Sequence, residues 1–381
     1  MHRITYVPVS HCAPAARALP TQSERCCDFS SKRVSGTAAR TRIVLRRTAS
    51  SAASGDLSPE QREQTVASSE STPVPSEPEI QRKRDKLASI YKFTRPHTIR
   101  GTILGAFAGC VRALMDSKAP IRMELVPRAL LGVVALLTAN AFIVGINQIY
   151  DVSIDRVNKP FLPMAAGKMS ARTAWVFIIS CLVLGLVIVR STFSPLIFGL
   201  YVFGLVVGFL YSVPPFRLKR YPVAAALSIS CARGFLLNFG VYHATRAALN
   251  VPFVWSPQIT FLACFMIVFS LVIALAKDIP DIAGDKMYKV NTFATRLGAE
   301  KMSNLVTAVL LGNYVFALVF AFLARAGSIR KPVMALGHLA LAIWLGNIRQ
   351  ELDASDSESI KRFYKNIWNL FYSEYALFLL I

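Results

Sequence analysis

Long apolar stretches separated by short polar segments make up most of this chain, and their lengths predict an all-helical membrane protein. A helix needs ~20 mostly apolar residues to cross the hydrocarbon core of a bilayer. Nine such stretches come after residue 97, and the first and the eighth are marginal in length. They cover residues 98–115, 127–146, 172–189, 195–211, 223–242, 258–276, 303–323, 332–347 and 364–381. The pattern therefore predicts about nine transmembrane helices.

The overall composition agrees with this prediction, because 54% of the 381 residues are hydrophobic and only 17% are charged. The net charge of +21 does not indicate nucleic-acid binding, since no soluble module carries basic residues interleaved with aromatic ones. The Lys and Arg residues lie mainly in the N-terminal tail and in short loops, as expected of topology signals. Seven cysteines lack the spacing of a metal site, and the last four lie in apolar stretches as expected of buried free thiols.

The N-terminal region differs from the rest of the chain. Residues 1–55 are rich in Ser, Ala, Thr and Arg and contain only two acidic residues, which predicts an organelle transit peptide. A disordered tail is the alternative, and composition alone does not separate chloroplast from mitochondrion. Residues 56–90 begin with a segment rich in Ser, Pro and Glu and are predicted to form a disordered linker. The membrane domain is then predicted to span residues 91–381.

A carboxamide and two carboxylates lie at the end of the second apolar stretch. Asn147, Asp151 and Asp155 are spaced i, i+4 and i+8, so on a helix they share one face. An isolated carboxylate at membrane depth costs about 2.5–3.5 kcal/mol, so a cation is expected beside it. Because all the ligands are oxygen atoms, the expected cation is Mg²⁺. Two aspartates solvated at a helix end are the alternative interpretation.

A second acidic cluster closes the sixth apolar stretch, where Asp278, Asp281 and Asp285 are spaced i, i+3 and i+7. Between the two clusters the chain crosses the membrane four times, so both clusters are expected on the same side and facing each other. Residues 86 to 350 contain only eight acidic residues, and five of them belong to these clusters, which argues against simple solvation. Two facing carboxylate clusters at a membrane surface predict two Mg²⁺ ions that hold a diphosphate, with a hydrocarbon tail inside the bundle.

Five segments of the chain carry a resemblance to a known family. They are NQIYDVSIDRVNKPFLPMAAGKMS, FLYSVPPFRLKRYPVAA, RGFLLNFGVYHATRAAL, KDIPDIAGDKMYKVNTFATRLG and NIWNLFYSEYALFLL. From about Tyr91 to Ile381 the chain resembles the UbiA superfamily of intramembrane aromatic prenyltransferases, and within it the solanesyl-transferring members of the plant and algal homogentisate branch. Gln148 stands where much of the superfamily carries Asp, a departure that the homogentisate branch shares and that leaves the role of Gln148 open.

The resemblance implies a bundle of nine helices around a central cavity, with two Mg²⁺ ions held by the two clusters. One ion would bind Asn147, Asp151 and Asp155, and the other Asp278, Asp281 and Asp285. The metals would assist departure of the diphosphate, and an electron-rich phenol would attack the allylic cation. The implied substrates are homogentisate and solanesyl diphosphate, joined with loss of CO₂ to give 2-methyl-6-solanesyl-1,4-benzoquinol for plastoquinone-9. The implied location is a chloroplast membrane, with the inner envelope expected.

Basic and aromatic residues near the clusters are candidates for binding the substrates. Arg156 and Lys159 follow the first cluster, Lys286 and Lys289 follow the second, and a role as topology signals is their alternative. Tyr211 and Lys219 match a superfamily pattern that is implied to reach the diphosphate or to cap the pocket. Arg95 and His97 precede the first span and are candidates for the acceptor carboxylate or the diphosphate. Arg233 and His243, around the fifth span, are candidates for the acceptor side, and Arg233 must face a polar interior.

Two rival functions remain on the sequence alone. One is transfer of a phytyl group by a homogentisate prenyltransferase of the tocopherol pathway. The other, from a different class, is cation-coupled transport, because acidic residues in membrane spans also mark ion pathways. Clusters at helix ends beside basic loops suit an anionic ligand better than a path through the membrane. The expected partners are the two substrates and membrane lipid, with no nucleic acid, and the sequence leaves protein partners open.

Overall fold

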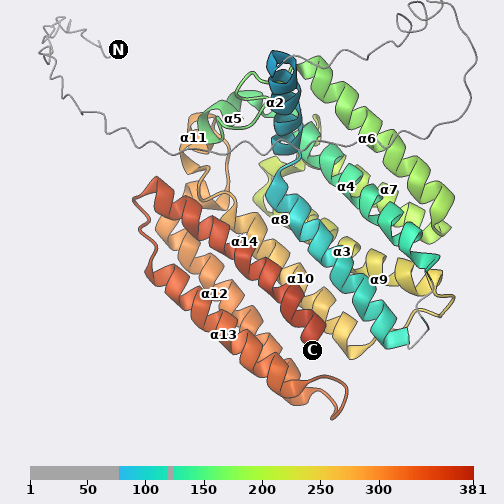
Figure 1. The fold of residues 1–381 in the computed structure, drawn as a ribbon. Helices are drawn as coiled ribbons and strands as arrows, with labels where there is room; N and C mark the ends of the chain where they lie inside the picture. The colour runs from blue at the N-terminus through green and yellow to red at the C-terminus, as the bar shows by residue number, and fades with distance from the viewer. Residues whose placement is uncertain (1–76, 118–119, 121–122) are drawn as a thin grey trace, which may run out of the picture. The chain divides into compact units, whose positions relative to one another are not determined.

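The computed structural model describes residues 77–117, 120 and 123–381, and in this part of the chain every regular element is a helix. The predicted transit peptide and residues 56–76 of the predicted linker lie outside the described residues. The helices belong to one unit, Val74–Ile381 (Figure 1). The prediction of an all-α fold is confirmed.

The first described helix, α2, spans Glu77–Phe93. The prediction of a disordered linker is therefore wrong for residues 77–90, which are helical. Residues with good helix propensity such as Arg, Lys, Ala and Leu dominate this segment. Gln81 donates a hydrogen bond to Asp85 one turn later, and the last residue, Phe93, is fully buried with its ring 5.9 Å from that of Phe177. Burial of this single aromatic side chain at the end of the helix anchors it to the bundle.

Eight helices of the described chain are long and apolar enough to cross a membrane. They are α3 (Pro96–Ser117), α4 (Leu125–Tyr150), α6 (Ala171–Thr192), α7 (Pro195–Ser212), the composite α8 (Pro222–Ile229), η2 (Ser230–Leu236) and α9 (Leu237–Ala248), α10 (Pro257–Ala276), α12 (Phe293–Leu323) and α13 (Lys331–Gln350). The last helix, α14 (Ser357–Leu380), occupies the ninth predicted span, but its first half carries Glu358, Lys361, Arg362 and Lys365. The ninth crossing therefore stays a prediction.

Helix α10 forms the centre of the larger hydrophobic core. Its Phe265 and Phe269 are almost completely buried and contact aromatic rings of α12 and α14, including Tyr314 and Phe371. A smaller core joins α2, α4 and α6 around Phe93 and Ile178. Helix α14 also packs against α3, so it links the C-terminal helices to the N-terminal ones. Figure 1 shows α14 beside α3 across the middle of the bundle.

An apolar cavity of about 360 Å³ lies between α3, α4, α7 and the composite helix α8–η2–α9. Its lining extends along α4 from Leu125 to Val144, which at 1.5 Å per residue is a length of ~28 Å. Most of the wall is Leu, Ile, Val, Ala and Gly, and Thr102, Asn140 and Arg233 add polar groups. The cavity can therefore hold an elongated apolar chain through most of the depth of a bilayer.

Two short helices follow the spans that end in the acidic motifs. Helix α5 (Val152–Asn158) follows α4, and α11 (Ile282–Met287) follows α10. The two pack against each other and lie side by side in Figure 1. A short 3₁₀ helix, η1 (Leu218–Arg220), follows α7. These three pieces carry most of the polar side chains that the sequence places at the site.

Candidate functional site

Helices α5 and α11 bring the two acidic motifs into direct contact. The Asn158 side chain accepts a hydrogen bond from the Gly284 backbone N–H (3.0 Å) and donates one to Asp285 Oδ1 (3.2 Å). Lys159 forms an ion pair with Asp281. These contacts join segments more than 120 residues apart and confirm the prediction that the two clusters face each other on one side of the bundle.

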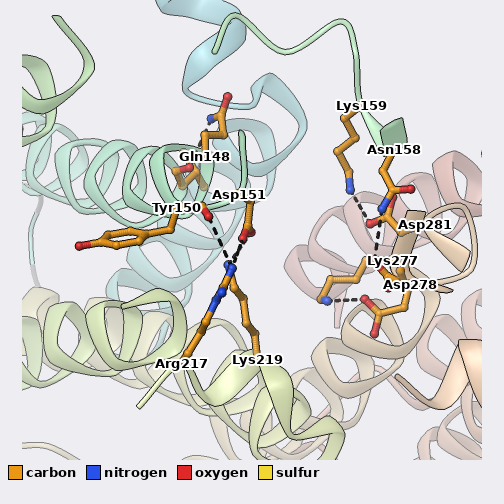
Figure 2. A network of polar contacts seen from close by, with 12 residues as sticks. Gln148, Tyr150, Asp151, Asn158, Lys159, Arg217, Lys219, Lys277, Asp278 and Asp281 are labelled. Atoms are coloured by element: carbon orange, nitrogen blue, oxygen red, sulfur yellow. Dashed lines mark hydrogen bonds and ion pairs between the residues drawn. The ribbon is translucent and has the colours of Figure 1, made fainter. Parts of the chain in front are cut away.

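Asp151 lies at the junction of α4 and α5 and is almost buried. Two basic side chains from the segment after α7 reach it: Arg217 donates to Asp151 Oδ1 at 3.0 Å, and Lys219 forms an ion pair with Oδ2. Arg217 has a left-handed backbone with φ of 41°, which turns the chain so that both cations point toward Asp151 (Figure 2). The structure thus brings the predicted residue Lys219 to the first cluster.

The remaining carboxylates lie in a crowded, largely buried environment. Burial raises the pKa of Asp155, and the charges of Asp151 and Asp281 add to this effect while Arg95 and Lys159 oppose it. Burial and the neighbouring Asp281 and Asp278 raise the pKa of Asp285 to about 7. These mutual effects show that carboxylates of both clusters share one electrostatic environment, in which an added cation would be stabilised.

The donor set fits Mg²⁺ that arrives together with a phosphate ligand. Among the described residues, no three His, Cys, Asp or Glu side chains converge closely enough to hold an ion alone. However, Asp155 Oδ2 is buried and has no hydrogen-bond partner, and the cluster ligands are oxygen atoms. Mg²⁺ commonly binds one or two carboxylates and completes its shell with water and substrate phosphates. This pattern suits two clusters in which Asp151, Asp278 and Asp281 are paired with Lys or Arg.

Three of the predicted basic residues do not reach the cluster contacts. Arg156, Lys286 and Lys289 are exposed on α5, on α11 and just after α11, so solvent satisfies their charges. Asn147 lies on α4 one turn before Asp151 and is half-buried. Tyr211, in the last turn of α7, is close enough to Lys277 for the two groups to interact electrostatically.

A second group of polar side chains lies where α3 begins. Arg95 has φ of 54° and its charge acts on Asp155, while its Nε atom is buried without a partner. The ring of His97 lies 5.1 Å from that of Trp368 on α14, and the guanidinium carbon of Arg233 lies 5.2 Å from the same indole ring. Arg233 also lines the apolar cavity. This group therefore connects the cavity to the first carboxylate cluster.

His243 does not join this group. It lies ten residues beyond Arg233 on α9, stacked on Phe253 at 5.3 Å and close to Phe239 at 5.7 Å. Its ring is part of an aromatic cluster at the end of the bundle away from α5 and α11. The structure therefore gives no support to its predicted place near the acceptor.

The model of the UbiA prenyltransferase family matches residues 102–370 of the chain. The chain belongs to the UbiA prenyltransferase family. It is 50% identical over 297 residues to probable homogentisate phytyltransferase 2, chloroplastic, of Oryza sativa subsp. japonica, a match that covers 77% of this chain and 78% of the relative. It is 47% identical over 290 residues to homogentisate solanesyltransferase, chloroplastic, of Arabidopsis thaliana, covering 76% of this chain and 75% of the relative.

These relatives place the UbiA chain in the homogentisate branch of the family. A solved structure with the same fold is that of a UbiA homolog from Archaeoglobus fulgidus bound to DMAPP and Mg²⁺. The two chains superpose with a TM-score of 0.54 at 18% sequence identity, covering 77% of this chain and all of the other. The fold is therefore a UbiA-type helical bundle.

Three residues of the site were not among those predicted from the sequence. Asn158 joins the two short helices, Arg217 pairs with Asp151, and Lys277 Nζ lies 2.5 Å from Asp278 Oδ1. Lys277 and Asn158 directly flank the acidic motifs, so their positions carried a usable signal. Arg217 carried none, because its approach to Asp151 depends on the left-handed turn.

Proposed function

We propose that this protein transfers a solanesyl group from solanesyl diphosphate to homogentisate with loss of CO₂, yielding 2-methyl-6-solanesyl-1,4-benzoquinol for plastoquinone-9. The observation that supports the proposal is an apolar cavity with polar groups in its wall close to Arg95, whose charge acts on Asp155 of the first cluster. Arg233 and Asn140 line the cavity, and Asn140 donates to the backbone of Thr94, next to Arg95. A prenyl tail in the cavity would thus end beside the clusters.

The diphosphate would occupy the space between α5, α11 and η1. Asn147, Asp151 and Asp155 would hold one Mg²⁺, and Asp278, Asp281 and Asp285 a second. Bound metal would supply charge stabilisation to the departing diphosphate. Lys219, Arg217 and Lys159 already pair with the carboxylates, so they would turn to the diphosphate oxygens once metal takes their places. Tyr211 would close the pocket beside Lys277.

The acceptor would bind on the side of α3 and α14. The charges of Arg95 and Arg233 are not engaged by any ion pair among the described residues, so they are free to bind the acetate group of homogentisate. His97 and Trp368 would form an aromatic wall for its ring. Arg156 and Lys286, which are exposed, would act at most as outer electrostatic guides for the anionic substrates.

Transfer of a phytyl group is the second candidate, supported by the 50% identity to the rice protein. A C45 tail cannot extend fully within a bilayer ~30 Å thick, so it must bend or leave the bundle sideways. We therefore expect loose selection of tail length and strict selection of the aromatic acceptor, whose polar groups must be matched inside the protein. Transport is not supported by membership in a prenyltransferase family.

The proposal predicts the outcome of an assay with purified protein, Mg²⁺ and radiolabelled homogentisate. Solanesyl diphosphate should give a decarboxylated, prenylated quinol, and farnesyl diphosphate should also react. Replacement of homogentisate by 4-hydroxybenzoate should abolish the product. A marked preference for phytyl diphosphate would favour the second candidate, and efficient use of 4-hydroxybenzoate would overturn the branch assignment.

We further propose that the protein acts in a chloroplast membrane, expected to be the inner envelope, after removal of residues 1–55 as a transit peptide. Two observations support this location. The rice and Arabidopsis relatives both carry the word chloroplastic in their names, and residues 1–55 have a transit-peptide composition.

A further inference from the structure

Gln148 lies within the first acidic motif but does not join the carboxylates. The side chain is fully buried, and its Nε2 donates a 2.6 Å hydrogen bond to the backbone carbonyl of Phe93 at the end of α2 and a 3.3 Å one to the carbonyl of Val144 on α4, while its Oε1 has no partner among the described residues. Figure 2 shows the side chain directed away from Arg217 and Lys219, the two cations that hold Asp151. Gln148 therefore binds the backbone where α2 ends, just before α3.

A second carboxamide on the same face of α4 donates a hydrogen bond to the backbone carbonyl of Thr94, the residue after Phe93. Asn140, two turns before Gln148, is nearly buried and donates from Nδ2 to the carbonyl of Thr94 at 3.2 Å. Carbonyls at the end of a helix have no partner within the helix, and buried ones need a donor from elsewhere. We call Gln148 and Asn140 the carboxamide clamp.

The carboxamide clamp holds the turn that carries Arg95. This residue has φ of 54°, a conformation that a non-glycine residue keeps only when its surroundings hold it in place. The Arg95 carbonyl accepts hydrogen bonds from the Thr98 backbone N–H (2.9 Å) and hydroxyl (2.8 Å). The turn is therefore fixed on both sides, from α4 and from the start of α3.

The orientation of this turn sets the direction of the half-buried Arg95 side chain. Arg95 Nε is buried without a hydrogen-bond partner, and its charge reaches both Asp155 and His97. Loosening the turn by a small rotation would move the far end of this long side chain by much more. Arg95 can bind an anion at a defined place only while the turn is rigid.

We propose that the carboxamide clamp is a positioning device for Arg95, which it holds in place to bind the carboxylate of the aromatic acceptor. The inference rests on the proposed function. It also explains why the residue at 148 is a carboxamide, because the partner is a carbonyl oxygen and the side chain must supply an N–H donor. A carboxylate at this position would meet the Phe93 carbonyl with lone pairs on both sides.

The test compares Gln148→Met, which keeps length but removes the donor, with Asn313→Leu as a matched control. Asn313 is also buried and donates to a backbone carbonyl, that of Phe265 at 3.1 Å, but it joins α12 to α10 in the C-terminal core. In Gln148→Met we expect the KM for homogentisate to rise about tenfold, with little change in the KM for the prenyl diphosphate or in the Mg²⁺ requirement. Asn313→Leu should lower thermal stability and leave both KM values unchanged.

A double-mutant cycle decides whether Gln148 acts through Arg95. Arg95→Gln should raise the acceptor KM at least as much as Gln148→Met, and the double variant should be no worse than Arg95→Gln alone. Additive effects, or a raised Mg²⁺ requirement in Gln148→Met, would overturn the proposal. So would an unchanged acceptor KM in an active Gln148→Met enzyme.

A second measurement does not depend on the acceptor. Lys92 is exposed, one residue before the clamped carbonyls, so release of the turn should make trypsin cleave faster after Lys92 in Gln148→Met than in the wild type or Asn313→Leu. Equal cleavage rates would overturn the clamp. Failure of the wild type to prenylate homogentisate would instead count against the proposed function, and the cleavage experiment would still judge the clamp.

Discussion

At the scale of single residues, three of the five cluster carboxylates are paired with a cation. Asp151 has Arg217 and Lys219, Asp281 has Lys159, and Asp278 has Lys277. Only Asp155 keeps a buried oxygen without a hydrogen-bond partner within the clusters. This distribution suggests that metal and diphosphate compete with basic side chains for the same oxygens. The carboxylates should therefore be individually indispensable.

Removal of one carboxylate from either cluster tests this expectation. Asp151→Ala and Asp281→Ala should each lower turnover by several orders of magnitude, because metal-mediated charge stabilisation is worth several kcal/mol. Asp85→Ala, which changes an exposed aspartate on α2, should have wild-type activity. Both the amount of inserted protein and the rate of Mg²⁺-dependent prenyl transfer are measured. Near-normal turnover in either cluster variant would contradict the model of two cooperating clusters.

The acidic residues could be predicted from the sequence because two local properties identify them. Their spacing places them on one face of a helix, and a carboxylate at membrane depth has a high free-energy cost. The contacts of Asn158 and Arg217 could not be predicted, since they depend on the approach of segments 127 and 66 residues away. Arg156 and Lys286 were predicted from their closeness in sequence to the clusters. Short helices instead turn these side chains outward, because neighbouring positions on a helix face different directions.

At the scale of elements, the close packing of α5 against α11 depends on the absence of a side chain at Gly284. A Cβ atom there would lie 2.1 Å from Asn158 Oδ1, well inside van der Waals contact. The same Asn158 side chain donates to Asp285. Any change that pushes Asn158 aside therefore separates the two halves of the site.

Gly284→Ala should lower kcat at least tenfold, because overpacking of this kind typically costs about 1–3 kcal/mol and the cost falls on the cluster geometry. Gly346→Ala is the matched control, since a Cβ at this helical position of α13 meets nothing within 4 Å. That control should be active and slightly more stable. Measurement of kcat and of thermal stability for both variants checks the prediction, which equal kcat values would refute.

Most spans could be predicted from length and hydropathy, while their interruptions could not. The fifth span contains a π-helical segment, η2, at Arg233, and α12 continues through a kink at Gly298, where φ is 81°. Helix α2 was hidden by its polar composition, because its anchoring depends on the tertiary burial of Phe93. These features arise from packing between helices, which a pattern along one segment does not contain.

At the scale of the whole molecule, the acidic motifs and many basic residues lie on one side of the bundle. The segments on that side contain Arg82, Lys83, Arg84, Lys86, Arg156, Lys159, Lys168, Arg217, Lys219, Arg220, Lys286, Lys289, Lys361, Arg362 and Lys365. The opposite segments of the described chain contain fewer, such as Arg112, Arg190, Arg246, Arg330 and Lys331. By the positive-inside bias, the site should face the stroma of the plastid.

Protease protection tests this orientation. A cleavage site placed just before Glu77 should resist a protease added outside intact plastids and should be cut once the envelope is opened. A second cleavage site near Asn250, in the segment after α9, should be accessible only from the side of the same membrane that faces away from the stroma. Cutting of the first site in intact plastids would contradict the stromal orientation.

The pairing of carboxylates with lysines and arginines also bears on how the protein is made. Unpaired buried charge would oppose both insertion of the chain and docking of α5 onto α11. Because Asp151, Asp278 and Asp281 have counter-ions within the chain, much of the charge on the polar face is paired during biogenesis before any metal or isoprenoid is present. We therefore expect maturation of the bundle to depend little on the supply of magnesium and prenyl donors in the organelle, so that their scarcity would limit product formation while the enzyme itself accumulates.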